Sequence, residues 1–160
     1  MKRFFKLSVY IIVLALLSCE NSEIELYQSN DEIIAVNYGT SFGERLGYCY
    51  HNIKITETEI EYNATGWLQN DKIPNITISQ QIDEADWLRI INEINFIIFR
   101  NLDEVIGCPD CADGGAEWVE IITNNLSHKV TFEYQNEPDQ LKELVNTLRE
   151  LMLNFEGEKE

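Results

Sequence analysis

The sequence predicts an α+β domain in which an antiparallel sheet of about five strands is covered on one face by two helices. Stretches in which apolar and polar residues alternate indicate strands with one wet face, whereas apolar residues that recur every three or four positions indicate amphipathic helices. The patterns follow the order strands, helix, hairpin, helix. Such an order is typical of helices gathered on one side of an antiparallel sheet.

The first strands are expected before residue 80. Residues 32–38 form a short apolar run, which suits a first strand. Residues 49–65 alternate and predict a hairpin that turns near Glu57, and a further strand is expected around 75–79. The apolar members of the alternation are Ile53, Ile55, Ile60 and Tyr62.

Helices and a second hairpin are expected in the rest of the chain. Asp83 can cap a helix that runs to about Asn95, and acidic residues follow it in the first turn. Residues 118–123 and 129–134 predict the second hairpin, and Pro138 can open the last helix. The apolar stripe of that last helix contains Leu141, Leu144, Val145, Leu148, Leu151, Met152 and Phe155.

The N-terminus predicts an exported precursor. Residues 1–6 carry three cations and no acid, as in the positive region that begins a signal peptide. An apolar stretch from Leu7 to Leu17 follows, and it is shorter than the ~20 residues that a membrane-spanning helix needs. Residues 1–18 are therefore expected to be a removable signal peptide.

The end of this segment, Leu16-Leu17-Ser18-Cys19, resembles the bacterial lipobox. The resemblance implies cleavage before Cys19 and attachment of acyl chains such as palmitate to it, which would anchor the mature protein to a membrane. Residues 19–31 are then an acidic tether, and residues 32–156 a single globular domain. The tether also resembles the acidic export signal of surface-displayed lipoproteins of the Bacteroidota, although a plain charged linker explains it as well.

The charge balance narrows the classes of partner. The 160 residues contain 12 Lys and Arg against 28 Asp and Glu, a net charge of −16, and removal of the signal peptide takes away three more cations. Such a negative field repels nucleic-acid phosphates and anionic lipid headgroups. We therefore expect no nucleic-acid binding and no membrane contact beyond the anchor, whereas a cationic partner or simple solubility fits the charge.

The cysteines carry the most informative chemistry. If Cys19 is lipidated, Cys49, Cys108 and Cys111 remain in the mature chain. Because exported compartments favour disulfides, one bridge is expected among the three, either from Cys49 to a member of the Cys108/Cys111 pair or within that pair.

A zinc site is the alternative use of these residues. Cys49 and His51 are two positions apart on a predicted strand, and Cys108-Pro109-Asp110-Cys111 is a Cys-x-x-Cys half-site. Together they form a Cys₃His set that suits a closed tetrahedral zinc site. Apart from this zinc alternative, no cofactor is expected.

Catalytic machinery is not recognisable in the sequence. No nucleophile-elbow, phosphate-loop or His-Glu-x-x-His pattern occurs, and the acidic residues near Cys108 disfavour a reactive thiolate. Of the two histidines, His128 is expected to be exposed beside the second hairpin's turn. The sequence thus favours a non-enzymatic binding or structural domain with an envelope partner, with a zinc-binding lipoprotein or an inhibitor or immunity-type protein as alternatives.

Two segments are similar to segments of small uncharacterised lipoproteins of the Bacteroidota. The first is residues 38–49, with Tyr38-Gly39-Thr40-Ser41-Phe42-Gly43 and Gly47-Tyr48-Cys49, and the second is residues 104–118, around Gly107-Cys108-Pro109-Asp110-Cys111. The likeness spans most of residues 38–152. It implies anchoring in the cell envelope, with the outer membrane as the expected location, and a cysteine loop that belongs beside Cys49. It implies no activity.

Overall fold

The computed structural model describes residues 31–43, 46–66 and 73–157. These residues belong to a compact unit that begins at Asp31. The predictions for the signal peptide, for Cys19 and for most of the tether lie outside the described residues.

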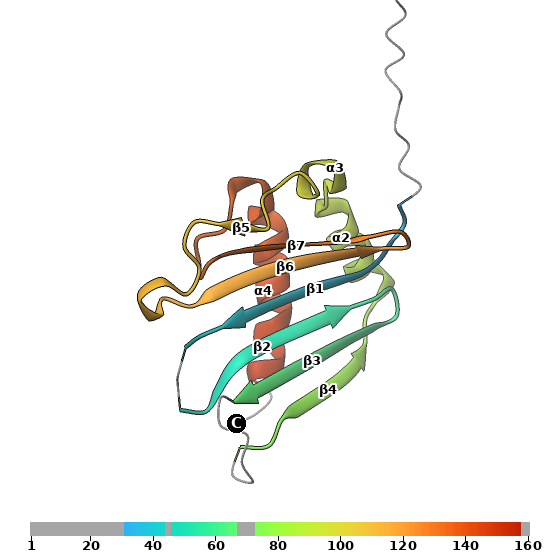
Figure 1. The fold of residues 1–160 in the computed structure, drawn as a ribbon. Coiled ribbons are helices and arrows are strands. Elements are labelled where there is room, and N and C mark those ends of the chain that lie inside the picture. The colour runs from blue at the N-terminus through green and yellow to red at the C-terminus, as the bar shows by residue number, and fades with distance from the viewer. Residues whose placement is uncertain (1–30, 44–45, 67–72, 158–160) are drawn as a thin grey trace, which may run out of the picture. The chain divides into compact units, whose positions relative to one another are not determined.

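One mixed sheet forms the centre of the domain (Figure 1). Its strands follow the order β4-β3-β2-β1-β6-β7-β5, and every described pairing is antiparallel except that of β5 with β7. The strands are β1 (Ile33–Ser41), β2 (Tyr48–Ile55), β3 (Glu59–Gly66), β4 (Ile76–Gln81), β5 (Val105–Ile106), β6 (Ala116–Thr123) and β7 (Ser127–Glu133).

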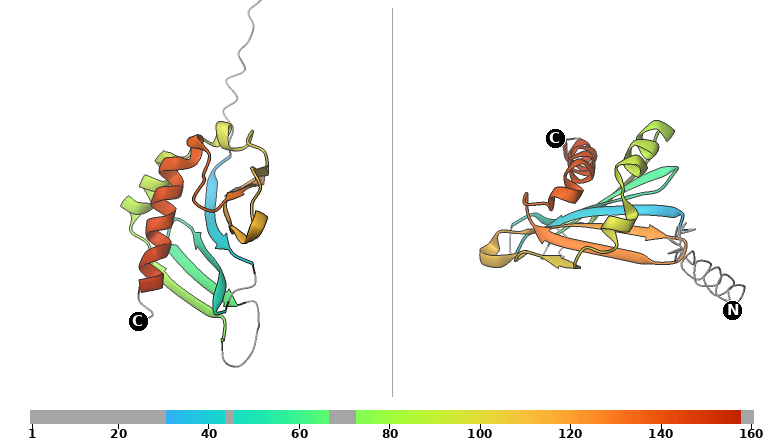
Figure 2. Two further views of the ribbon diagram at one scale, coloured as in Figure 1. Left: turned by 90° about the vertical axis from the view of Figure 1, so that its left-hand side faces the viewer. Right: turned by 90° about the horizontal axis from the view of Figure 1, so that it is seen from above.

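The helices lie on one face of this sheet (Figure 2). They are α2 (Glu84–Glu93), α3 (Phe96–Phe99) and the long α4 (Lys142–Gly157), which runs across the strands. Two short 3₁₀ turns, η1 (Cys111–Asp113) and η2 (Asp139–Leu141), lie in the connecting loops. Within the described ranges, no helix is both long and apolar enough to cross a membrane.

The core lies between the helices and the covered face of the sheet. Alternation in the strands supplies inward-facing residues, and the apolar stripe of α4 packs on them. Tyr62 of β3 and Phe155 of α4 stack with ring centroids 5.5 Å apart. Buried core residues include Val36, Tyr38, Ile53, Ile55, Trp87, Ile90, Phe99, Val119, Ile121, Val130, Phe132, Leu144 and Leu148.

The predicted fold class was wrong in three respects: the sheet has seven strands instead of about five, it is mixed, and three helices cover it. The short strand β5 exists only through pairing with β7, where the Thr131 N–H also donates to the Glu104 carbonyl at 2.9 Å. Two residues are too few for a periodic pattern. The α3 turn is held by its cap, because the Asn95 side chain accepts a hydrogen bond from the Ile98 N–H at 3.2 Å.

The open face of the sheet carries a buried aromatic residue. Trp118 is buried, but strand alternation places it on the face opposite Val119 and the helices. Its indole covers Gly39, where a Cβ atom would lie 2.5 Å from the ring, and the Lys129 ammonium lies 4.0 Å from its centroid. Tyr50 stacks beside it at 6.3 Å.

Candidate functional site

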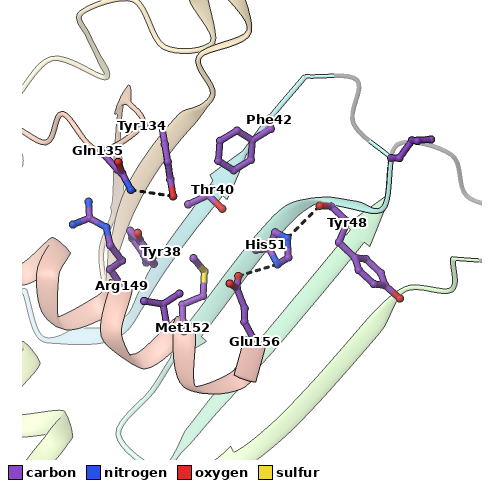
Figure 3. Close-up of a pocket in the computed structure, with 12 residues that line it drawn as sticks. Tyr38, Thr40, Phe42, Tyr48, His51, Tyr134, Gln135, Arg149, Met152 and Glu156 are labelled. Atoms are coloured by element: carbon purple, nitrogen blue, oxygen red, sulfur yellow. Dashed lines mark hydrogen bonds and ion pairs between the residues drawn. The ribbon is translucent and has the colours of Figure 1, made fainter. Parts of the chain in front are cut away.

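A cleft of about 390 Å³ opens on the covered face of the sheet, between α4 and the strand ends that α2 and α3 do not cover (Figure 3). The end of β1, the start of β2 and the residues after β7 form its floor and far wall, and the second half of α4 forms its near wall. Its lining residues are Tyr38, Thr40, Phe42, Leu46, Tyr48, His51, Tyr134, Gln135, Arg149, Met152, Leu153 and Glu156.

A buried carboxylate organises one side of the cleft. Glu117 of β6 faces inward in register with Thr40 and Phe132, and its side chain is fully buried. Arg149 of α4 donates to it from Nε and Nη2, with nitrogen-to-oxygen distances of 2.9–3.1 Å. The Tyr38 hydroxyl and the Gln135 N–H, the latter at 2.9 Å, also donate to this carboxylate. Both carboxylate oxygens are thus satisfied, which offsets the loss of hydration on burial.

The charges around Arg149 shift the protonation of its neighbours. Burial, followed by the nearby Glu117 carboxylate, raises the pKa of Tyr38, so its hydroxyl remains a donor. Burial alone would lower the pKa of Arg149, but the hydrogen bond that it donates to Glu137 and the charge of Glu117 outweigh this effect and raise that pKa. Burial would raise the pKa of Glu137, yet a backbone hydrogen bond and Arg149 at 3.0 Å hold it below its ordinary value. The cluster therefore holds one cation between two carboxylates.

A histidine occupies the opposite side of the cleft. His51 Nδ1 lies 2.7 Å from the Tyr62 hydroxyl and 3.2 Å from a carboxylate oxygen of Glu156, and its Nε2 lies 3.3 Å from the Tyr48 carbonyl oxygen. Both ring nitrogens of His51 are therefore engaged with protein oxygen atoms. Burial, and then the Glu156 charge, raise the pKa of Tyr62. These contacts join β2 and β3 to the last turn of α4.

Aromatic side chains form the mouth of the cleft. Phe42 and Tyr134 meet edge to face, with centroids 4.7 Å apart. Gly115 lies against Phe42, because a Cβ at Gly115 would be 2.5 Å from Phe42 Cδ1. Tyr48 points to the other side, where its hydroxyl donates to the Pro74 carbonyl at 2.9 Å. The cleft is thus apolar at its mouth and charged at its depth.

The four residues of the predicted zinc set do not meet. Cys108 and Cys111 have their sulfurs at bonding distance, with their Cα atoms 5.5 Å apart, so the bridge within the pair is the one present. Cys49 is buried and free, with its Sγ 3.9 Å from the Thr65 carbonyl oxygen, and His51 is engaged in the cleft. Across the described residues, no group of three or more His, Cys, Asp or Glu side chains is placed to hold a metal ion.

The second histidine departs from its prediction. His128 is half-buried instead of exposed, because Nε2 lies 3.0 Å from the Leu102 carbonyl and its ring meets Phe99 edge to face at 5.4 Å. The α3 segment that covers it was not predicted. His128 therefore supports packing at the sheet edge and is not among the residues that line the cleft.

Sequence reasoning missed the residues that define the cleft. Glu117 directly precedes the predicted strand 118–123, and Arg149 adjoins Leu148 on the predicted apolar stripe. Two opposite charges on otherwise inward-facing positions are a usable signal for a buried ion pair. The pairing itself was invisible, because 32 positions separate the two residues.

Comparison with protein-family models finds no match to the chain, and comparison with curated proteins finds none either. The likeness to Bacteroidota lipoproteins therefore stays a prediction. The cleft and the N-terminal signal remain as the observations from which a function can be inferred.

Proposed function

We propose that the protein is an exported lipoprotein, anchored through Cys19 in the cell envelope and most naturally in the outer membrane, and that its folded domain is a non-enzymatic binding module. The order of cations, apolar stretch, Ser18 and Cys19 supports the anchor. The described part of the domain contains an amphipathic cleft beside α4 that is large enough for a small ligand, and this observation carries the binding role.

The size and lining of the cleft support a small ligand. Ligand pockets span about 300–1,000 Å³, and this cleft of about 390 Å³ falls in that range. Phe42 and Tyr134 offer ring faces and edges, Leu153 adds apolar surface, and Gln135 adds an amide. A molecule with an aromatic or apolar body and one polar group matches this lining.

The state of the ionisable groups supports binding over catalysis. Arg149 is held by Glu117 and Glu137, and His51 is held by Glu156 and Tyr62. Groups already engaged with protein partners keep a fixed position and can orient a ligand without reorganising. The same pairing would have to be broken before His51 or Glu156 could move a proton to or from a substrate.

The position of the cleft along β1 supports its accessibility. The described unit starts at Asp31, directly before β1, whereas Thr40 and Phe42 at the far end of β1 line the cleft. A strand advances about 3.3 Å per residue, so a nine-residue strand separates the two by roughly 25 Å. The cleft therefore lies at the end of β1 that is far from Ile33, where the strand begins.

The anchor is tested by replacing its cysteine. We expect Cys19→Ala to abolish incorporation of labelled palmitate and to release the protein from the membrane fraction. The matched control is Cys49→Ala, which alters a buried cysteine of the folded domain and should leave lipid attachment intact. A Cys19→Ala protein that still carries acyl chains would overturn the proposal.

The cleft is tested with p-cresol as an aromatic probe in an NMR titration of the backbone amides. We expect the shifts to concentrate at Thr40, Phe42 and Tyr134. Leu153→Trp should fill the mouth and reduce the affinity at least about tenfold. Leu88→Trp is the matched control, because both leucines are exposed on helices, at 54% and 49%, but Leu88 lies on α2. Equal loss of binding in both variants, or shifts spread over the whole sheet, would contradict a ligand site here.

A further inference from the structure

The Cys108–Cys111 disulfide is open to solvent. Both cysteines are exposed, and the loop that holds them lies between β5 and β6, bounded by Gly107 and Gly115. Thiol–disulfide exchange needs an attacking thiolate to reach one of the two sulfurs. The two sulfurs are therefore accessible to a reductant, in contrast to Cys49 of β2, which is buried.

The backbone of the loop is held in an unusual conformation. Asp110, Ala112 and Asp113 all adopt left-handed φ angles, of 61°, 53° and 58°. Residues with a Cβ atom rarely adopt these angles, and alanine has no side-chain polar group that would compensate. The cross-link between positions 108 and 111 restrains this segment, so opening the bond allows the chain to relax toward ordinary angles.

The same loop supports the aromatic mouth of the cleft. The Gly115 carbonyl accepts hydrogen bonds from the N–H groups of Asp110, at 3.0 Å, and Tyr134, at 3.3 Å. Phe42 packs directly on Gly115 and meets the Tyr134 ring. One carbonyl thus connects the disulfide loop to both aromatic residues of the wall.

A second connection runs through Glu133. Its Oε1 accepts the Cys108 N–H at 3.0 Å, and its Oε2 accepts the Asn136 side chain at 2.7 Å. These two hydrogen bonds, the first from the Cys108 backbone, hold the pKa of Glu133 below its ordinary value. Because Glu133 directly precedes Tyr134, a movement of Cys108 also shifts Tyr134 through this hydrogen bond.

We propose that the Cys108–Cys111 disulfide is a thiol–disulfide exchange site for a dithiol reductant, and that its reduction loosens the Phe42 and Tyr134 wall of the cleft. This regulation rests on the proposed function of the cleft as a ligand site. Asp110, Asp113 and Glu133 surround the cysteines with negative charge, which disfavours their thiolates. The pair is therefore the substrate of exchange and not its catalyst.

The exchange balances in two steps. A thiolate of the reductant attacks one sulfur of the pair, the Cys108–Cys111 bond breaks, and a mixed disulfide forms while the released cysteine takes up a proton. The second thiol of the reductant, as thiolate, then displaces the remaining cysteine, which also takes up a proton. The reductant leaves as a disulfide, and Cys108 and Cys111 are left as two thiols.

The test uses the complete protein in its folded state, either oxidised or treated with dithiothreitol under native conditions. Alkylation and mass spectrometry count the thiols, and amide hydrogen exchange follows the wall. We expect complete reduction without unfolding, and about tenfold faster exchange at Tyr134, with Val130 in the preceding strand β7 unchanged. The variant C108S/C111S should show the fast exchange without reductant, whereas C49S should behave as the oxidised wild type.

Two results would overturn the inference: a disulfide that resists reduction until the domain unfolds, or Tyr134 exchange that is the same in both redox states and in C108S/C111S. A p-cresol titration of the two redox states separates this inference from the proposed function. Weaker binding after reduction supports the regulation. Failure of p-cresol to bind either form contradicts the ligand site, while the exchange data still decide whether the disulfide controls the wall.

Discussion

The two sides of α4 show how the same sheet face can be closed by apolar packing or left open by a charged cluster. On one side, α2 and α3 cover the strands with Trp87, Ile90 and Phe99, and Thr147 of α4 donates to Glu93 of α2 at 3.0 Å. On the other side no helix of the described chain covers the strand ends, and the cleft lies there (Figure 3).

The contrast teaches what each side contributes. The closed side stabilises the fold mainly by removing apolar surface from water. On the cleft side, α4 is joined to the strands by two ion pairs, Arg149 with Glu117 and Glu156 with His51. Buried ion pairs add little net stability, but they fix geometry, as a binding site requires.

The largest expected effect comes from breaking the charged cluster. Arg149→Ala leaves the fully buried Glu117 without its cation, and we expect a loss of about 3–5 kcal/mol in the free energy of unfolding, measured by urea denaturation. The double variant Glu117→Gln with Arg149→Met removes both charges and should recover most of this loss. A double variant as unstable as Arg149→Ala would show that the cost does not come from an unpaired charge.

Truncating a core side chain on the closed side of α4 should lower the free energy of unfolding by a similar or slightly smaller amount. Ile90→Ala removes a fully buried side chain of α2, and we expect it to cost about 2–4 kcal/mol because it leaves a cavity. Leu153→Ala, at the mouth of the cleft, is the comparison and should stay within about 0.5 kcal/mol. If the two variants were equally destabilised, the two sides of α4 would not differ in packing as the structure indicates.

The pH dependence of the free energy of unfolding tests the pairing of Glu137 with Arg149 on the cleft side. Because the pKa of Glu137 is lowered in the folded state, its contribution is fully present above the ordinary value of 4.5 and is lost as the pH falls below that value. The stability difference between wild type and Glu137→Gln should therefore shrink on acidification. Urea denaturation at a series of pH values measures it, and a difference that is independent of pH would contradict the assigned pairing with Arg149.

The smallest expected effect concerns the last turn of α4. Glu156→Gln weakens the contact with His51, which is partly exposed to solvent, and we expect a loss of no more than about 1 kcal/mol. Hydrogen exchange near Phe155 should nevertheless increase, because the contact joins the end of α4 to β2. Glu150→Gln on the exposed side of the same helix is the control. Equal hydrogen exchange in both variants would show that the contact between Glu156 and His51 does not hold the end of α4.

Much of the secondary structure followed from local patterns. The alternation around Ile53 and Ile60 predicted β2 and β3, and the stripe from Leu141 to Phe155 predicted α4, because side-chain periodicity reflects which face is buried. The disulfide was one of the alternatives that cysteine spacing left open, and the structure places it within the Cys108/Cys111 pair.

The cleft could not be predicted in the same way. His51 was singled out, but as a zinc ligand beside Cys49, whereas its partners Tyr62 and Glu156 come from β3 and the end of α4. Glu117 and Arg149 carried charges at positions that pattern analysis assigned to a strand boundary and a helix stripe. Their role depends on which strand lies beneath which helix turn, and no local window contains that information.

The sequence by itself determined the types of the longer elements, because periodicity is a property of neighbouring residues. It predicts the export signal from another local property, the order of cations, apolar stretch, Ser18 and Cys19. Only the tertiary structure decided that β5 joins β7 in parallel, that α3 caps the sheet edge over His128, and that Glu117 meets Arg149. These features rest on hydrogen bonds and ion pairs between distant segments. Their free energy arises only after burial has removed water from both partners.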